Sequence, residues 1–270
     1  MLLLALGRFS QGIRELPFAV VRPALTELLR EFGPTRTANH PEYPFWRLQS
    51  DGVWEVQPHK GLVKRASNTD PTTRALLSAN AVGQFPKAIQ LLLTRTQGLV
   101  QRSADLLLTN HFPHSLHSDI RNAVGLSPEN ATLPRCARNA GFRREVMISY
   151  GYACAVCRLS LRLNDATIGL DAAHIRWRQA DGPDVVTNGL ALCSLHHKLF
   201  DLGAFTLSES RRVLVSERVT GSEQLRDVLH AYHNAPLAAP VRPEHQPGAN
   251  FVAWHRQQVF KESPLPTPHK

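Results

Sequence analysis

Two pairs of metal-binding side chains lie in the second half of the chain. Cys154 and Cys157 form a C-x-x-C pair, and Cys193 and His196 form a C-x-x-H pair. Each pair has the spacing with which one turn presents two ligands, and thiolates with an imidazole suit a tetrahedral zinc site. The alternative is a chance set of reduced thiols in a small core. We predict a structural zinc ion, which leaves Cys136 as a spare buried thiol rather than a disulfide partner.

A histidine, an asparagine and a second histidine follow in order around the second pair. His174 lies on an apolar segment, Asn188 in a loop rich in turn formers, and His197 directly after His196. Any histidine-rich chain can supply such an order alone. The segments AAHI, NGLALC and HHKLFD, interleaved with the metal-binding pairs, resemble the HNH nucleases. That family folds two strands and a helix around a metal. The resemblance covers roughly residues 150–207, and FVAWHRQQVF near the C-terminus resembles the closing helix of such proteins.

The resemblance implies a role for each of these side chains in phosphodiester hydrolysis. His174 would be the base that accepts a proton from water. Asn188 would orient His174, either by accepting its other ring N–H or by fixing the loop carbonyl that does so. His197 would bind the catalytic divalent ion. Asp201, one helical turn later, falls on the same face and is the expected second ligand, with a surface carboxylate or helix cap as the alternative.

The chain departs from the family at the residue before the base. Many HNH proteins have a metal-binding Asp or His there, but this chain has Ala173. Strand alternation turns Asp171 away from His174, which favours Asp201 as the ligand. His196 and His197 point about 100° apart on a helix, so one can face zinc while the other faces the active site. The catalytic ion is expected to differ from the structural zinc and to be Mg²⁺ or Mn²⁺, because these ions prefer oxygen and water ligands.

The composition leaves nucleic acid open as a partner. The chain has 270 residues, 43% of them hydrophobic, and a net charge of +9. Most of its basic residues are arginine, whose guanidinium suits phosphate. Charge alone does not separate a DNA partner from a solvated basic surface. No stretch has the length of a membrane helix, and Arg8, Arg14 and Glu15 follow the apolar opening too closely for a signal peptide. A cytoplasmic protein is expected.

The elements that position these residues divide into two modules. Residues 1–142 are the more basic and form the expected recognition module, whereas residues 143–270 hold the chemistry. The first module is expected to contain an amphipathic helix over 19–32, a β-hairpin over 43–56 with its turn at Asp51-Gly52, helices over 71–80 and 85–110, and a short helix over 116–124. The second is expected to contain helices near 142–151, 195–202, 222–233 and 250–260, and strands near 168–175, 190–193, 204–207 and 213–216.

Three segments of the first module, in order upstream of the nuclease motif, carry a further resemblance. They are residues 32–56, 110–126 and 135–143. With the HNH motif they resemble the phosphorothioation-dependent restriction endonucleases, in which a sulfur-binding domain docks on DNA with a sulfur-modified backbone. The implied fold class is α+β: a mostly helical N-terminal DNA-recognition domain with a β-hairpin, followed by a zinc-stabilised ββα-metal nuclease domain.

The resemblance also implies a sulfur site in the first module. Sulfur accepts hydrogen bonds poorly, so an apolar cup receives it at a lower desolvation cost than a phosphate oxygen. Phe112, Pro113 and Leu116 would form the cup, with His111, His114 and His117 nearby. Arg47 and Arg138 would hold phosphates or a guanine edge. Without the resemblance, Phe112-Pro113 is a helix stop with a buried ring, and Arg47 a surface residue.

The expected function is a type IV-like, modification-dependent endonuclease that binds phosphorothioated double-stranded DNA and cuts nearby. Three alternatives remain: an HNH nuclease directed by methylcytosine or by no modification, an inactive HNH-fold DNA-binding protein, and a zinc-stabilised protein-interaction module. Cutting both strands requires two active sites or two visits, so a homodimer is expected.

Overall fold

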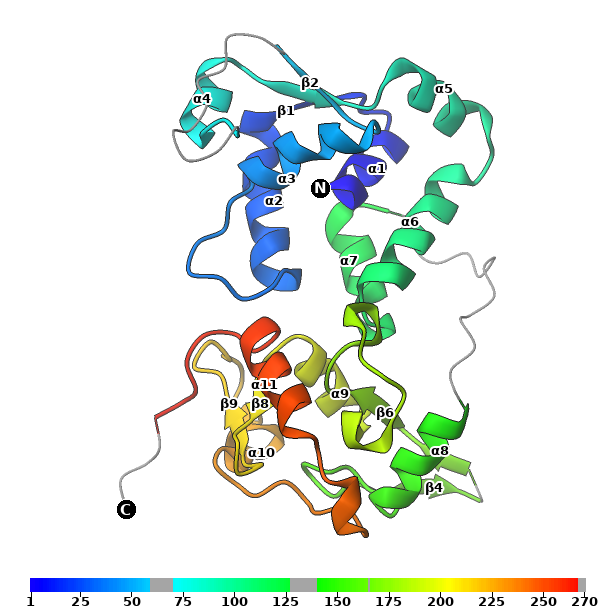
Figure 1. Ribbon diagram of the computed structural model, residues 1–270, viewed down its shortest axis with the longest axis vertical. Helices are drawn as coiled ribbons and strands as arrows, with labels where there is room; N and C mark the ends of the chain where they lie inside the picture. The colour runs from blue at the N-terminus through cyan, green and yellow to red at the C-terminus, as the bar shows by residue number, and fades with distance from the viewer. Residues whose placement is uncertain (59–69, 127–139, 165, 267–270) are drawn as a thin grey trace. The chain divides into compact units, whose positions relative to one another are not determined.

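The computed structural model describes residues 1–58, 70–126, 140–164 and 166–266. The chain forms two compact units, coloured from blue to red along the chain in Figure 1. Unit 1 comprises Met1–Leu108 and His117–Leu133, and unit 2 comprises Thr109–Leu116 and Pro134–Lys270. The predicted domain boundary at residues 142/143 stays a prediction. No helix among the described residues is long and apolar enough to cross a membrane.

Unit 1 is mostly helical and has one small sheet. The three short strands pair antiparallel in the order β1-β3-β2. The strands are β1 (Glu15–Pro17), β2 (Glu55–Gln57) and β3 (Val82–Gln84), and the helices are α1 (Leu2–Ser10), α2 (Phe18–Phe32), α3 (Glu42–Arg47), α4 (Thr73–Ser78), α5 (Lys87–Arg95), α6 (Leu99–His111) and α7 (His117–Val124). The last residues of α6 belong to unit 2.

Aromatic side chains fill the core beside this sheet. The Trp54 ring meets Phe45 and Phe85 edge-on, with centroids 6.0 and 5.7 Å apart. Such edge-to-face pairs add stability beyond their buried area. Gly83 on β3 makes room for the cluster, because a Cβ there would lie 2.2 Å from a carbon of the Trp54 ring.

The predicted hairpin over 43–56 is wrong. Glu42–Arg47 is the helix α3, and Leu48–Asp51 is a 3-10 helix. Pro44 is tolerated because it lies in the first turn of α3, where its missing N–H has no helical partner. Gly52, with φ of 70°, ends the 3-10 helix in the left-handed conformation instead of forming a hairpin turn. Only Glu55–Gln57 becomes a strand, and it pairs with the distant β3.

Unit 2 contains the expected two strands and helix. The antiparallel pair β6 (Leu170–His174) and β7 (Gly189–Cys193) is followed directly by α9 (Ser194–Asp201). The remaining elements are α8 (Ala140–Ser149), the hairpin of β4 (Leu161–Leu163) and β5 (Ala166–Ile168), the pair β8 (Phe205–Leu207) and β9 (Val213–Val215), α10 (Leu225–Val228) and α11 (Ala249–Gln258). The predicted α+β class is confirmed, with a small three-stranded sheet in the N-terminal unit in place of the predicted β-hairpin. The helix predicted over 222–233 is wrong in extent, since α10 covers four residues before a 3-10 turn.

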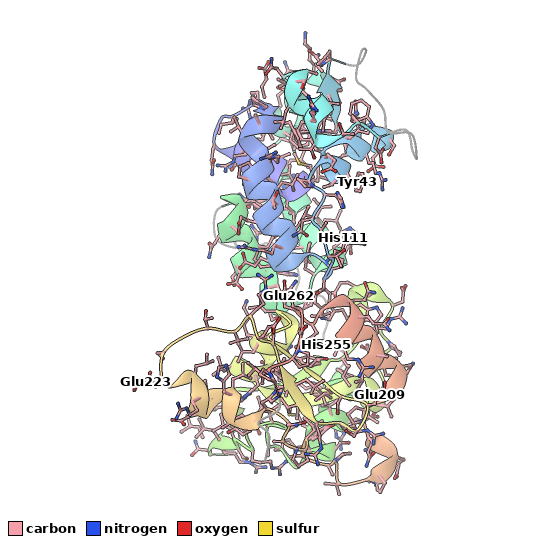
Figure 2. The ribbon with its side chains drawn as sticks, turned by 90° about the vertical axis from the view of Figure 1, so that its left-hand side faces the viewer. Tyr43, His111, Glu209, Glu223, His255 and Glu262 are labelled. Atoms are coloured by element: carbon pink, nitrogen blue, oxygen red, sulfur yellow. The ribbon has the colours of Figure 1, made fainter. Side chains whose placement is uncertain are left out.

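A buried histidine on α11 supports α9 from behind. Figure 2 shows His255 within unit 2, whereas Glu209 and Glu223 lie at its surface. The Phe200 carbonyl can only accept, so His255 Nε2–H donates to it at 3.1 Å, and the Thr206 hydroxyl donates to Nδ1 at 2.9 Å. The His255 ring also stacks on the Phe200 ring at 3.7 Å. These contacts join α11, β8 and α9.

The burial of His255 makes unit 2 less stable in acid. Burial lowers the pKa of His255 from 6.5 to about 4. Between these values the unfolded chain binds a proton that the folded chain does not, so stability falls as pH falls from 6.5 towards 4, by roughly 3 kcal/mol in total. We expect His255→Gln, which cannot titrate, to flatten the pH dependence of the free energy of unfolding, measured by denaturant titration at several pH values. An unchanged slope contradicts this origin.

Candidate functional site

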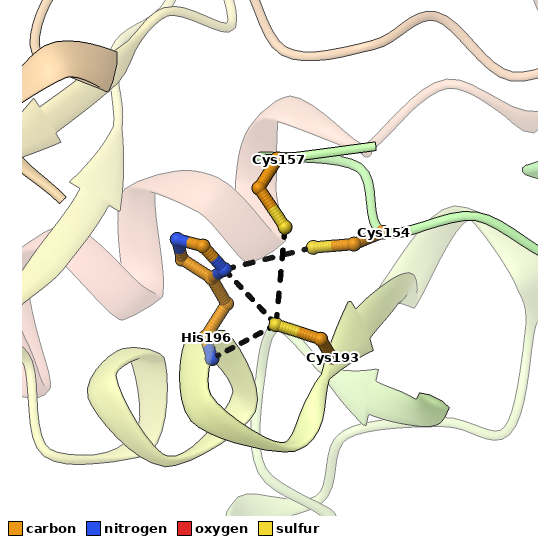
Figure 3. A group of neighbouring side chains, drawn as sticks. All are labelled: Cys154, Cys157, Cys193 and His196. Carbon is orange, nitrogen blue, oxygen red and sulfur yellow. Dashed lines mark hydrogen bonds between the residues drawn. The ribbon is translucent and has the colours of Figure 1, made fainter. Parts of the chain in front are cut away.

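The four predicted zinc ligands lie together in unit 2. Cys154 and Cys157 come from the turn after α8, Cys193 ends β7, and His196 lies in the first turn of α9, as Figure 3 shows. His196 Nδ1 is 3.1 Å from Cys193 Sγ and 3.8 Å from Cys154 Sγ, and Cys157 Sγ is 4.0 Å from Cys193 Sγ. Donors that lie ~2.3 Å from one ion in a tetrahedron are themselves a little under ~4 Å apart. The cluster is consistent with a structural zinc ion.

The surroundings of the cluster shift the pKa values of its thiols and orient the His196 ring. Hydrogen bonding with Cys193 lowers the pKa of the Cys154 thiol and raises that of Cys193, because the pair shares a proton. The His196 ring meets two aromatic rings edge-on, with its centroid 5.9 Å from that of Phe205 and 5.7 Å from that of Tyr232. Its Nε2 has no hydrogen-bond partner among the described residues, whereas Nδ1 faces the sulfur atoms. His196 therefore offers Nδ1 as its ligand atom.

A pocket of about 700 Å³ lies on the other side of α9. It is lined by His174, His197 and Asp201, three of the four residues predicted for the catalytic site. Asp171 and Asp184 line it as well. Arg143 and Arg178 add positive charge to the wall. The pocket therefore holds imidazole, carboxylate and guanidinium groups, which suit proton transfer, cation binding and phosphate binding respectively.

His174 is held on two sides within this pocket. Its Nε2 lies 2.8 Å from Asp184 Oδ1, and its ring stacks on Phe142 with centroids 4.2 Å apart. Burial lowers the pKa of His174 below its ordinary 6.5, although Asp184 opposes the shift. The imidazole is therefore mostly neutral at pH 7, the form that can accept a proton.

Asn188 is completely buried, does not line the pocket, and directs its hydrogen bonds to Arg176 and Pro183 instead of His174. Its Oδ1 accepts from the Arg176 backbone N–H at 2.8 Å, and its Nδ2 donates to the carbonyls of Arg176 and Pro183, each at 3.0 Å. Asn188 thus holds the loop that carries Asp184, and the group that contacts the His174 ring is the Asp184 carboxylate instead of the expected loop carbonyl.

His197 lies between two carboxylates. Its Nδ1 is 3.5 Å from Asp171 Oδ2, and its Nε2 is 3.2 Å from Asp201 Oδ2. Burial alone would lower the pKa of His197, but Asp201 and Asp171 together raise it to about 10. Two carboxylates beside one imidazole can bind a cation, and Arg143 Nη1, 3.8 Å from Asp171 Oδ1, offsets part of their negative charge.

The expectation that Asp171 faces away from the site is wrong. Asp171, Ala172 and His174 all line the pocket, whereas Leu170 and Ala173 are buried. The burial pattern of β6 therefore departs from simple alternation, and α9 packs on this strand so that His197 reaches Asp171. Asp184 was not predicted at all. It lies in a turn-rich loop, where no periodicity shows which way a carboxylate points.

The segment Thr109–Leu116 contributes to the same pocket within unit 2. Pro113, His114 and Ser115 line it. The Ser115 hydroxyl donates to Asp201, and Lys198 on α9 donates to the Ser115 carbonyl. Of the residues predicted for the sulfur cup, Pro113 therefore lies at this pocket, Phe112 is half-buried, and Leu116 is buried. Of the neighbouring histidines, His111 and His114 are exposed and His117 is buried.

The predicted arginines lie elsewhere. Arg47 is in unit 1, where its Nε and Nη2 donate to Asp70 Oδ2 at 2.8 and 2.6 Å. Its guanidinium lies over the Tyr43 ring at 4.4 Å. Arg138 and Cys136 lie outside the described residues.

Two family models match the chain. One, described as the ScoMcrA-like DNA sulfur-binding domain, matches residues 1–129. The other, described as HNH endonuclease, matches residues 154–208, which contain the cysteine–histidine cluster and His174, Asn188, His197 and Asp201. No match is found among curated proteins.

Several solved structures are similar to parts of the chain. The sulfur binding domain of ScoMcrA complexed with phosphorothioated DNA is 22% identical over 46% of this chain and 80% of that chain, with a TM-score of 0.40. The modification dependent TagI restriction endonuclease is 26% identical over 50% of this chain and 41% of that one, with a TM-score of 0.33. The type IV phosphorothioation-dependent restriction endonuclease ScoMcrA is 22% identical over 46% of this chain and 27% of its own, with a TM-score of 0.39.

We expect the purified chain to hold one zinc ion that stabilises unit 2. Cys154→Ser removes a thiolate ligand, so the zinc content measured by mass spectrometry of the metal should fall to near zero and the unfolding transition of unit 2 should broaden or disappear. Cys136→Ser, outside both pairs, is the matched control and should keep its zinc. Equal zinc content in the two variants contradicts the assigned ligand set.

Proposed function

We propose that the chain is a type IV-like, modification-dependent endonuclease, because residues 1–129 match the model of a ScoMcrA-like DNA sulfur-binding domain and residues 154–208 match that of an HNH endonuclease. It binds phosphorothioated double-stranded DNA and hydrolyses phosphodiester bonds nearby. The observation that carries this proposal is the pocket shared by His174, His197 and three carboxylates, with His196 of the cysteine–histidine cluster on the same helix as His197. The alternative is an HNH endonuclease that is directed by methylcytosine or has no preference for modified DNA.

His174 acts as the general base in the proposed reaction. The neutral imidazole accepts a proton from water while the water oxygen forms a bond to phosphorus. The bond from phosphorus to the leaving sugar oxygen breaks, and that oxygen takes up a proton. Arg143 and Arg178 on the pocket wall pair with the phosphate oxygens of the strand. Phe142 keeps the His174 ring in one orientation.

His197 with one of its two neighbouring carboxylates would offer two ligands to a divalent ion such as Mg²⁺ or Mn²⁺. When bound, such an ion polarises the phosphate and stabilises the charge on the leaving oxygen. The sequence pairs His197 with Asp201 as ligands, but the two carboxylates face different nitrogens of the ring. Among the described residues, only the cysteine–histidine cluster brings three or more donor atoms mutually close enough for one ion. Asp171, His197 and Asp201 therefore do not converge on one point.

We propose that the ion lies on the Asp171 side and that Asp201 holds the ring from the other side. The Asp171 side chain is 32% exposed, which leaves space for the water ligands that Mg²⁺ retains, whereas the Asp201 side chain is 2% exposed. A carboxylate that accepts the distal N–H of a metal-binding histidine fixes its orientation. The Ser115 hydroxyl fixes Asp201 in turn.

Recognition of the sulfur is proposed for the segment around Phe112 and Pro113. Proline offers a C–H surface without a donor, which suits a sulfur atom better than an oxygen. Leu116 is buried and would support this surface from beneath. Arg47, with two of its nitrogens fixed by Asp70, and Arg138 are proposed to contact the DNA backbone or a guanine edge. A homodimer that cuts both strands remains part of the proposal.

The decisive substrate is a duplex with one stereodefined phosphorothioate, compared with its unmodified and methylcytosine counterparts. We expect tighter binding and Mg²⁺- or Mn²⁺-dependent cutting of one phosphorothioate isomer. His174→Ala should bind equally well but cut about 10²–10⁴-fold more slowly, because it removes the base. Glu223→Gln at the surface of unit 2 is the control. Equal binding of all three duplexes would contradict recognition of the sulfur. Undiminished cutting by His174→Ala would contradict the assignment of His174 as the base.

The two carboxylates beside His197 should differ in their effects. Asp171→Asn should raise the Mn²⁺ concentration for half-maximal cleavage by about tenfold or more, because it removes a charged ligand. Asp201→Asn should lower the maximal rate with a smaller change in that concentration. Asp227→Asn, an exposed carboxylate on α10, should change neither. If Asp201→Asn alone weakens Mn²⁺ dependence, Asp201 is the ligand, as the sequence pairing suggests.

A further inference from the structure

We propose that Asp184 is a positioning residue that fixes the tautomer of His174; this inference rests on the proposed role of His174 as the base. His174 Nε2 and Asp184 Oδ1 are 2.8 Å apart. An ionised carboxylate can only accept a hydrogen bond, so the hydrogen between them belongs to Nε2. A neutral imidazole with a proton on Nε2 has its lone pair on Nδ1. Asp184 therefore selects Nδ1 as the atom that accepts the proton from water.

The loop that carries Asp184 is rigidly held. Gly182 N–H donates to the Trp177 carbonyl at 3.0 Å, and a Cβ on Gly182 would lie 1.9 Å from the Arg176 carbonyl oxygen. Arg176 Nε donates to the Ala180 carbonyl at 2.7 Å. These contacts define one loop conformation and hence one position for the Asp184 carboxylate.

Asn188 connects this loop to the strand that follows it. Its amide bonds to Pro183, the neighbour of Asp184, and to both backbone groups of Arg176. The effect of Asn188 on His174 therefore passes through the loop and Asp184 instead of through a direct bond. This path accounts for a completely buried asparagine that does not line the pocket.

Phe142 and Asp184 restrict the His174 ring in complementary ways. The Phe142 ring stacks at an angle of 17°, which sets the plane of the imidazole. The carboxylate sets the rotation within that plane, because Nε2 must point at Oδ1. With both constraints, Nδ1 has one orientation. The Asp184 charge also stabilises the imidazolium that forms when Nδ1 accepts a proton.

The test compares Asp184→Asn and Asp184→Ala with Asp181→Asn, an exposed aspartate in the same loop whose left-handed backbone an asparagine tolerates. The tautomer is read from the ¹⁵N shifts of the His174 ring in the zinc-loaded chain without DNA or divalent ion, at a pH where His174 is neutral. We expect Nε2–H in the wild type and in Asp181→Asn. In Asp184→Asn the amide donates to Nε2, which moves the proton to Nδ1. In Asp184→Ala the preference for Nε2–H weakens.

Cleavage of the phosphorothioated duplex supplies the second readout. The wrong tautomer in Asp184→Asn should lower kcat by about 10²–10⁴-fold with KM, DNA affinity and zinc content unchanged. Asp184→Ala should also lower kcat, and Asp181→Asn should cut as the wild type does. An Nδ1–H tautomer in the wild type, or a normal kcat in a folded Asp184→Asn, overturns the proposal. If the tautomers behave as expected but the wild type cuts no DNA, positioning by Asp184 is supported while the proposed function fails.

Discussion

The start of α9 is the constraint on which the site depends. The helix begins immediately after Cys193, and His196 in its first turn faces the cysteine cluster. Successive side chains on a helix point about 100° apart. Because the cluster fixes the direction of His196, it also fixes His197, which faces Asp171 and the pocket. One short helix thereby carries both a member of the cysteine–histidine cluster and His197 of the pocket.

The surrounding elements hold this helix from the other sides. His255 bonds to the Phe200 carbonyl, and the Ser115 hydroxyl bonds to Asp201 near its end. Ser115 adjoins Pro113, a residue proposed for sulfur recognition. Pro113 and Ser115 therefore line the same pocket as His174 and His197.

The sequence was most informative where ligand spacing is set by local geometry. The cysteine–histidine cluster follows from residue types in two short turns, and His174 and His197, proposed as base and metal ligand, were identified by their order around it. The prediction of a hairpin over 43–56 was wrong because Asp51-Gly52 also suits the end of a 3-10 helix. Only the packing of the buried Phe45 and Trp54 decides between a hairpin turn and a helix end. The positions of Asp171 and Asp184 depend on how α9 packs on β6 and on how Asn188 folds the loop, which no short-range pattern encodes.

The most direct test of this account is a crystal structure of the full chain with zinc and Mn²⁺, in which anomalous scattering identifies each ion. The account predicts zinc between Cys154, Cys157, Cys193 and His196, and manganese between His197 and Asp171 within the pocket. Manganese absent from His197 at a concentration that supports DNA cleavage, or zinc bound away from the cysteines, would contradict it.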